Sequence, residues 1–447
     1  MATTPDSRRR GPVSAWVGLL VALLLMLVAS VVQPWLGWDV HARASGDSFF
    51  PPLHGYWQPK VGPGTVPALV LAVLGWRYAE SCAERLPWRA LLAASYAAGL
   101  AWLLALAFVD GTSGISRALG NPDEYLRTAR DVTDVHALLT GYVAHIPFGA
   151  PDNWPTHVAG HPPGALLVFV GLDRVGLGGD FAAGLVVTLA AATTALAVLT
   201  TLRTLGAEAV ARRAAPFLVL APAAVFMAVS ADALFAAVAA WGMAALALAA
   251  TSAGRARTIA WSVPAGLLLG YAVMMSYGLP LIGLVALAIL VLARSWLPLP
   301  VAAASAAAVV LAFAATGFSW WQAYPVLNDR YWDGIAADRP ASYWLWGNLA
   351  ALLFSAGPLL GAGLGRLGAL RDRADRVVVL LVSAAAFAVV VADVSRMSKA
   401  EVERIWLPFV PWLLVCCALL PERWRRVGLG LQVVTALVVQ HLLLTGW

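Results

Sequence analysis

The sequence is dominated by long stretches of apolar residues that hold almost no charge. Hydrophobic residues make up 61% of the 447-residue chain and charged residues only 12%, against about 45–50% and about 25% in soluble domains. Runs of about 20 apolar residues match the hydrocarbon core of a bilayer. We therefore expect an all-α, polytopic transmembrane helical bundle, and this composition excludes a soluble enzyme, a disordered chain and a disulfide scaffold.

Thirteen apolar runs are predicted to be membrane segments. A fourteenth, 164–178, is short and carries two charges, so we expect a half-spanning or re-entrant helix there. The first run follows a basic head, and no cleavage site follows it, which predicts a retained signal anchor. The thirteen runs are 13–33, 64–80, 90–109, 180–202, 214–230, 233–252, 258–276, 280–297, 299–317, 347–365, 377–393, 405–420 and 426–445.

The positive charges predict which helix ends face the cytoplasm. With the N-terminus inside, the inner segments together with Arg77 at the adjoining helix end hold 19 of the 30 Lys and Arg, although the outer loops are more than twice as long. An excess of this kind marks the cytoplasmic side. We therefore expect a single membrane domain, 1–447, in the plasma membrane. Its inner segments are 1–12, 78–89, 203–213, 253–257, 294–298, 366–376 and 421–427.

Four outer loops concentrate the polar and aromatic residues of the chain. They are 34–63, 110–163, 318–346 and the short basic loop 394–404. We interpret the aromatic loop 318–346 either as a lid or acceptor platform or as a packed cap. In the first loop Asp39, His41, Asp47 and His54 are of the types that bind a divalent cation, but such short polar pairs are more often hydrogen-bonding residues, and no metal site is assigned.

The second outer loop has two polar motifs. Asp123-Glu124-x-Tyr125 follows an Asn-Pro turn and opens a short helical pattern, where acidic residues either cap the helix or serve chemistry. Trp154 comes later, and His161-Pro162-Pro163 then leads into an apolar helix. The alternative for this and the other loop tryptophans is the interfacial aromatic belt.

The order of these motifs resembles the first outer loop of GT-C glycosyltransferases. It is most similar to protein O-mannosyltransferases and lipid A aminoarabinose transferases. Residues 221–232 (APAAVFMAVSAD) resemble the segment of that superfamily that ends in an Asp, here Asp232. Residues 402–413 (VERIWLPFVPWL) resemble its late Arg-aromatic-Leu-Pro segment, which contains Arg404. The departures are two extra membrane segments before the signature loop and Gly164 in place of a usual Leu.

This resemblance implies a sugar transfer on the outer side of the membrane, with inversion. The donor is a polyprenyl-phosphate sugar, and the acceptor is a glycan, a glycolipid or a protein of the cell envelope. Asp123 is expected to be the general base and Glu124 to support it. Tyr125, Trp154, Asp232 and Asp39 are expected near the substrates. The few Lys among the basic residues are typical of a GC-rich genome, such as that of an actinobacterium.

The leaving phosphate needs positively charged partners. Arg404 is the first choice because a guanidinium forks to two phosphate oxygens at headgroup depth. Its alternative is an ion pair with the flanking Glu401 or Glu403, and snorkelling to the interface is the alternative for every basic residue here. The further candidates are Lys399, Arg396, Arg330 and His161.

Two other functions stay open from the sequence. A lipid or sugar transporter or flippase would place charges inside the spans and repeat its helix pattern, which this sequence does not do. A non-catalytic envelope assembly protein is the other alternative. A nucleic-acid partner is not expected because the basic residues are scattered over short loops.

Overall fold

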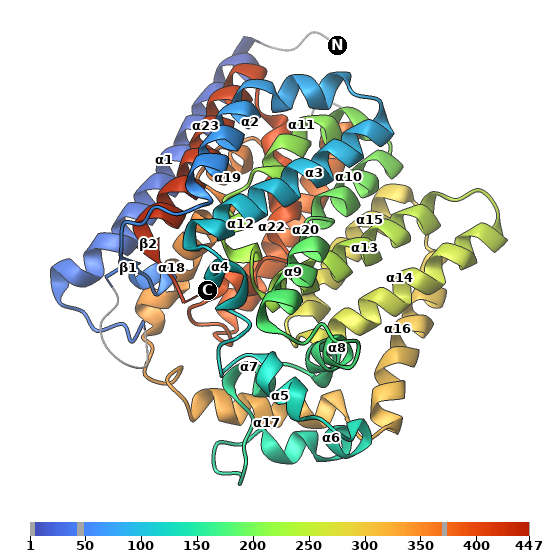
Figure 1. The fold of residues 1–447 in the computed structure, drawn as a ribbon. Helices are drawn as coiled ribbons and strands as arrows, with labels where there is room; N and C mark the ends of the chain where they lie inside the picture. The colour runs from blue at the N-terminus through green and yellow to red at the C-terminus, as the bar shows by residue number, and fades with distance from the viewer. Residues whose placement is uncertain (1–4, 43–48, 369–372, 447) are drawn as a thin grey trace.

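The structure, a computed structural model, describes residues 5–42, 49–368 and 373–446. Almost all of its regular structure is helical (Figure 1), and one two-stranded sheet joins β1 (Tyr56–Trp57) to β2 (Leu443–Leu444). The predicted all-α fold is therefore confirmed. Its helices form one bundle in which chain-distant segments lie side by side.

Seven helices in the described part of the chain are long and apolar enough to cross a membrane. This supports a multi-pass membrane protein. The span Asp180–Thr204 is made of two consecutive helices. The helices are α1 (Pro5–Leu36), α3 (Trp88–Ala107), α9 (Asp180–Ala191) with α10 (Thr194–Thr204), α13 (Ala231–Thr251), α14 (Arg255–Met275), α16 (Pro298–Ala315) and α20 (Arg373–Val394).

The other six predicted membrane runs do not form single long apolar helices. Two of them, in α2 (Thr65–Arg85) and α23 (Glu422–Leu442), belong to 21-residue helices that are charged at one end. Breakers divide the rest, such as Pro222 and the Gly357-Pro358 pair. The pieces are α11 (Glu208–Val219) and α12 (Ala224–Met227), η4 (Leu279–Ile282) and α15 (Gly283–Ala293), α18 (Ala341–Ala356) and α19 (Leu359–Leu364), and α22 (Val410–Leu414) and η5 (Val415–Leu419).

The predicted count of 13 or 14 membrane segments is therefore not confirmed. The short run 164–178 forms α8 (Pro163–Arg174), a helix of 12 residues. At 1.5 Å per residue α8 is about 18 Å long, which is less than the hydrocarbon thickness of about 30 Å. It is too short to span, as a half-spanning or re-entrant helix would be.

Short elements connect the long helices. Several of them lie in the four segments that were predicted to be outer loops. These elements are η1 (Pro51–Leu53), η2 (Phe108–Asp110), α4 (Ser113–Ser116), α5 (Tyr125–Asp131), α6 (Val135–Gly141), η3 (Tyr142–His145), α7 (Thr156–Ala159), α17 (Trp320–Trp332) and α21 (Val402–Ile405).

Small residues set the packing of the bundle. The alanine-rich α13 is its central helix, with 78% of its most apolar window buried, against 17% for the peripheral α16. Between α14 and α16, a Cβ added at Gly266 would lie 2.1 Å from the carbonyl oxygen of Ala302. Close backbone approach of this kind is how helices associate in a lipid environment, where apolar burial alone gives little preference.

One end of the bundle brings together segments that were predicted to be cytoplasmic. The Nη1 of Arg212 donates hydrogen bonds to the carbonyl oxygens of Ala83 and Leu86, at 2.8 and 2.9 Å. The Nε of Arg425 lies 3.0 Å from a carboxylate oxygen of Glu80. Three of the predicted inner segments therefore share one end.

The four loops predicted outside meet one another elsewhere in the fold. Arg339, after α17, donates from Nε to the carbonyl oxygen of His41 and from Nη1 to that of Lys399, at 3.0 and 2.7 Å. Arg330 on α17 donates to the carbonyl oxygen of Trp154 at 2.9 Å. Figure 1 shows α5, α6, α7 and α17 gathered at one end of the bundle.

Labelling of single cysteines tests which end faces out. In a background with Cys82→Ser, we expect a membrane-impermeant maleimide to label Asp329→Cys in intact cells and to label Arg213→Cys only after permeabilisation. Both positions are exposed, and the remaining cysteines are buried. The opposite pattern would show that the predicted orientation is wrong.

Candidate functional site

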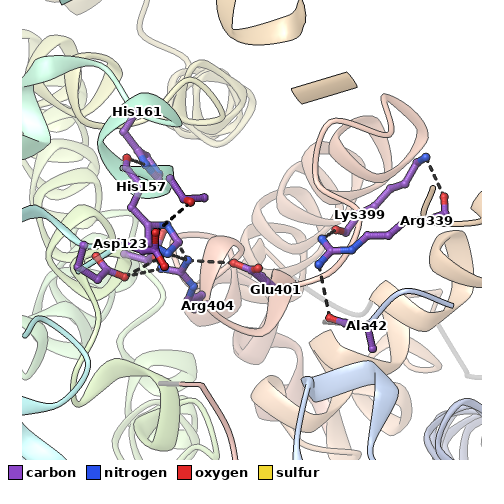
Figure 2. A network of polar contacts seen from close by, with 11 residues as sticks. Ala42, Asp123, His157, His161, Arg339, Lys399, Glu401 and Arg404 are labelled. Carbon is purple, nitrogen blue, oxygen red and sulfur yellow. Dashed lines mark hydrogen bonds and ion pairs between the residues drawn. The ribbon is translucent and has the colours of Figure 1, made fainter. Parts of the chain in front are cut away.

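A buried group of charged side chains lies where the second loop, the last loop and the start of α13 meet. Its members are Glu124, His157, Asp232, Glu401 and Arg404. The cluster draws on four chain segments, and its closest contacts centre on Arg404. Figure 2 shows Arg404 and Glu401 beside His157, with Lys399 and Arg339 forming a separate group.

The guanidinium group of Arg404 is surrounded by carboxylates. Its Nη1 lies 3.1 Å from an oxygen of Asp232 and 3.4 Å from an oxygen of Glu124. Its Nη2 lies 3.1 Å from an oxygen of Glu401 and 3.0 Å from Nδ1 of His157. The ion-pair alternative for Arg404 is therefore present, with three carboxylates rather than one.

The turn before α5 presents Glu124 to this cluster. The side-chain oxygen of Asn121 accepts a hydrogen bond from the backbone N–H of Asp123, and its carbonyl oxygen accepts one from the backbone N–H of Glu124. These two bonds shape the turn. Glu124 occupies the N-cap position of α5 but makes no capping hydrogen bond with its side chain. Its carboxylate points to Arg404 instead, so simple capping does not explain this residue.

Asp232 and Glu401 reach Arg404 by different routes. Asp232 is in the first turn of α13, where the positive end of the helix dipole favours a carboxylate. Glu401 has the left-handed backbone conformation, with φ of 62°, as does Ala400 before it. A left-handed conformation is costly for residues other than glycine. The backbone at Ala400 and Glu401 is therefore strained in the conformation that places Glu401 beside Arg404.

Burial and charge act on the cluster in opposite directions. Burial raises the pKa of Glu124 to about 7, although the nearby Arg404 lowers it, and Asp232 and Glu401 raise it further. For Glu401 the balance differs: burial raises its pKa, but the cations around it, Arg404 foremost, outweigh burial and hold it well below its usual range. Near neutral pH an ionised Glu401 therefore lies beside the cationic Arg404, while Glu124 is close to its own pKa.

Two histidines close the cluster on the side of the second loop. Burial and Arg404 lower the pKa of His157 well below its usual value, so His157 is neutral. Burial also lowers the pKa of His161, and its Nδ1 donates to the carbonyl oxygen of His157 at 2.8 Å. Both imidazoles are thus available as neutral hydrogen-bonding groups and add no charge.

Asp123 lies beside the cluster but on the surface. Its side chain is exposed, and one carboxylate oxygen accepts a hydrogen bond from the hydroxyl of Thr156 at 3.3 Å. The backbone N–H of His157 donates to the carbonyl oxygen of Asp123 at 3.0 Å. The exposed Asp123 carboxylate is therefore fixed to the same short segment that carries His157.

Aromatic residues pack beside this cluster. Tyr125 is buried and stacks on Phe169 of α8, with ring centroids 5.2 Å apart. The indole N–H of Trp154 donates to the carbonyl oxygen of Tyr142 at 2.8 Å. The hydroxyl of Tyr142 in turn donates to the carbonyl oxygen of Val158, at 2.7 Å. Tyr125 and Trp154 thus pack around the site.

The remaining predicted site residues lie outside the cluster. Arg330 is held by backbone carbonyls of the second loop and stacks over the ring of Phe148. The Nζ of Lys399 donates to the carbonyl oxygens of Ala336 and Arg339, at 2.8 and 2.9 Å. Arg396 is exposed on the same short loop.

In the first loop, a carboxylate oxygen of the exposed Asp39 accepts a hydrogen bond from the backbone N–H of His41 at 2.8 Å. Among the described residues, the polar contacts of Asp39 are with His41 alone. Asp47, one of the possible cation ligands, lies outside the described residues. In the described part of the chain, no group of three or more His, Cys, Asp or Glu side chains is arranged to hold a metal ion.

Sequence reasoning overlooked His157 and treated Glu401 only as a possible ion-pair partner. The signal for His157 was its spacing of four residues from His161, which places both on one side of a helical turn. Glu401 stands three residues before Arg404, the other spacing at which side chains on a helix meet.

Fold and site together define a helical membrane protein with a buried ionic centre where its loops meet. No protein-family model, no curated protein and no solved structure matches this chain.

The raised pKa of Glu124 predicts a pH-dependent stability. The folded state favours its protonated form, so its stabilising contribution is complete below pH 4.5 and is lost as the pH rises through about 7. The full difference is on the order of 3 kcal/mol. We therefore expect Glu124→Gln to gain stability relative to the unsubstituted protein between about pH 5 and pH 8.

Thermal unfolding of the purified protein across this pH range measures the effect. The exposed Glu422→Gln is the matched control, and its melting curve should follow that of the unsubstituted protein. A Glu124→Gln variant that loses relative stability as the pH rises would show that the Arg404 ion pair outweighs burial.

Removal of the central cation should destabilise the fold. Arg404→Met leaves the buried Glu124 and Asp232, and the partly exposed Glu401, without their shared partner, and such a loss typically costs about 3–5 kcal/mol. The exposed Arg396→Met, eight residues earlier, should change the melting temperature little. Equal melting temperatures for the two variants would contradict a structural role for Arg404.

Proposed function

We propose that this chain is a membrane glycosyltransferase. It transfers a sugar from a polyprenyl-phosphate donor to an acceptor of the cell envelope, at the end of the bundle where the four predicted outer loops meet. The observation that carries the proposal is the contact of Arg404 with Glu124 and Asp232. These residues belong to three separate motifs of the resemblance, and Arg404 and Glu124 are 280 positions apart.

Chance alone rarely brings three such weak motifs to one point. Each motif is short and was identified in the sequence without regard to contact with the others. Their meeting supports the idea that they serve one site, because a scaffold could satisfy a buried arginine with residues from any part of the chain. Perturbed titration in such a cluster is a further mark of functional sites.

Asp123 is the group best placed to act as the base. It is exposed beside the buried cluster, and Thr156 fixes its orientation. Its carboxylate takes the proton of the acceptor hydroxyl while that oxygen forms a bond to the anomeric carbon. The bond from the anomeric carbon to the donor phosphate breaks, and the phosphate leaves with the electron pair, so the configuration inverts.

Glu124 and Arg404 are positioning residues in this proposal. Glu124 is buried at 5% exposure, too deep to meet an acceptor, and its contact with Arg404 fixes the turn that presents Asp123. The guanidinium of Arg404 is occupied by carboxylates, so it is a poor ligand for a phosphate. Among the predicted phosphate ligands, the exposed Arg396 is the better placed to meet a lipid phosphate.

The decisive experiment is a transfer assay with purified protein. A radiolabelled polyprenyl-phosphate sugar is incubated with envelope extract, and the label that moves to acceptor is measured. We expect Asp123→Asn to lower the rate by about 10²–10⁴ without changing the melting temperature, which is the usual cost of losing a general base.

Asp131→Asn is the matched control, because Asp131 is an exposed carboxylate at the end of the same short helix α5. It should keep the full rate. Near-normal transfer by Asp123→Asn would remove Asp123 from the reaction. Absence of transfer from every polyprenyl-phosphate sugar tried would overturn the proposed function itself.

A further inference from the structure

Three aromatic rings meet where the chain leaves α14 and enters α17. Trp320 and Tyr324, one helical turn apart on α17, stack with centroids 5.3 Å apart and planes inclined by only 2°. Tyr277, just after α14, leans on both rings at 5.5 and 5.8 Å. All three side chains are partly exposed, so the cluster (Tyr277, Trp320 and Tyr324) combines an accessible face with a packed interior.

This aromatic cluster holds two polar atoms that are covered yet unbonded. The hydroxyl of Tyr277 and the indole Nε1 of Trp320 make no hydrogen bond with any described residue. A covered polar group without a partner costs free energy, and most native structures satisfy such groups. The phenol of Tyr142, by contrast, is fully bonded to carbonyl oxygens of the second loop.

The helix α17, which carries two of these three rings, contacts both loops that contribute to the candidate site. Burial, and then the neighbouring Tyr277, raise the pKa of the Tyr142 phenol, which bonds to the carbonyl oxygens of Val158 and His161. At the other end, the hydroxyl of Tyr331 accepts a hydrogen bond from the backbone N–H of Lys399 at 2.8 Å. The helix therefore lies along the flank of the site.

Arg330 fixes the position of α17 relative to the second loop. Besides the carbonyl oxygen of Trp154, its guanidinium contacts Asn153 Oδ1 at 3.3 Å and the carbonyl oxygen of Ile146. Trp320, Tyr324 and Tyr331 share one face of the helix by their spacing of four and seven residues. The side of α17 that meets the site is thus set by a buried cation rather than by loose packing.

We propose that Tyr277, Trp320 and Tyr324 form a subsite for a neutral saccharide ring. This inference rests on the proposed function and names the chemistry that its substrate must present. An aromatic face covers the apolar C–H side of a sugar, and the phenol of Tyr277 and the indole N–H of Trp320, once a rotation of their side chains uncovers them, bond its hydroxyl groups. The cluster contains no charged side chain, and the nearby Arg330 is already bonded to the second loop.

The neighbouring Trp321 has the exposure expected of a tryptophan in an interfacial aromatic belt. It is 53% exposed and lies outside the stacked group, with no ring contact among the described residues. Trp320 differs from it in stacking and in its covered indole nitrogen. Trp321 is therefore the matched control for any test of the subsite.

Direct binding tests the subsite without requiring sugar transfer. Full-length protein is purified in a detergent without sugar head groups and titrated with methyl α-mannopyranoside, methyl α-arabinofuranoside and methyl β-galactopyranoside by saturation-transfer NMR. We expect at least one glycoside to bind. Trp320→Phe and Tyr277→Phe, which each remove one polar atom and keep a ring, should raise its Kd about five- to tenfold. Trp321→Phe should leave the Kd unchanged.

Competition then separates two sources of the saccharide. Displacement of the glycoside by polyprenyl-phosphate mannose, but not by polyprenyl phosphate alone, assigns the subsite to the donor sugar. Retention of the glycoside assigns it to the acceptor. Either result supports a saccharide subsite.

Three results would overturn this inference: no glycoside binds at millimolar concentration, Trp320→Phe and Tyr277→Phe bind like the unsubstituted protein, or Trp321→Phe loses as much affinity as they do. If Trp320→Phe does not accumulate, Tyr277→Phe alone decides. If the variants weaken glycoside binding as expected but the protein transfers no sugar, only the proposed function is wrong. Transfer without any effect of the variants on binding would sink only the subsite.

Discussion

A guanidinium group inside a protein needs opposite charge within hydrogen-bond reach, and Arg404 obtains it from three carboxylates, two of which come from distant parts of the chain. Glu124 comes from the second loop, Asp232 from the start of α13, and Glu401 from the turn just before Arg404. A buried cation with one partner is costly, whereas a cation shared by several oxygens offsets more of its lost hydration. The positions of three segments therefore depend on a single charge.

The loop that carries Arg404 is fastened on its other side as well. Lys399 and Arg339 bond to backbone carbonyls, and the backbone N–H of Ala400 donates to the side chain of Asn348 on α18. Between these anchors, Ala400 and Glu401 take left-handed conformations that neither residue favours. Anchors at both ends explain why such a backbone persists, since relaxation of the turn would break contacts on both sides.

Composition and periodicity predicted the helical membrane fold well, because apolar residues locate the buried and lipid-facing segments directly. The same signal predicted more spans than the seven long apolar helices of the described chain, since it does not register where breakers such as Gly357 and Pro358 divide an apolar run. At the site, motif reasoning identified Glu124, Asp232 and Arg404 as important residues. It missed His157, and it did not foresee that Arg404 would be saturated by carboxylates, because both depend on which distant segments touch.

The short sheet has a consequence for how this chain reaches its final structure. Leu443 and Leu444 pair with Trp57 and Tyr56, and the backbone N–H of Lys60 bonds to the carbonyl oxygen of His441. The first loop is therefore completed by a segment that directly follows α23. This loop cannot reach its final structure until α23 has been synthesised, however early the helices around it are inserted.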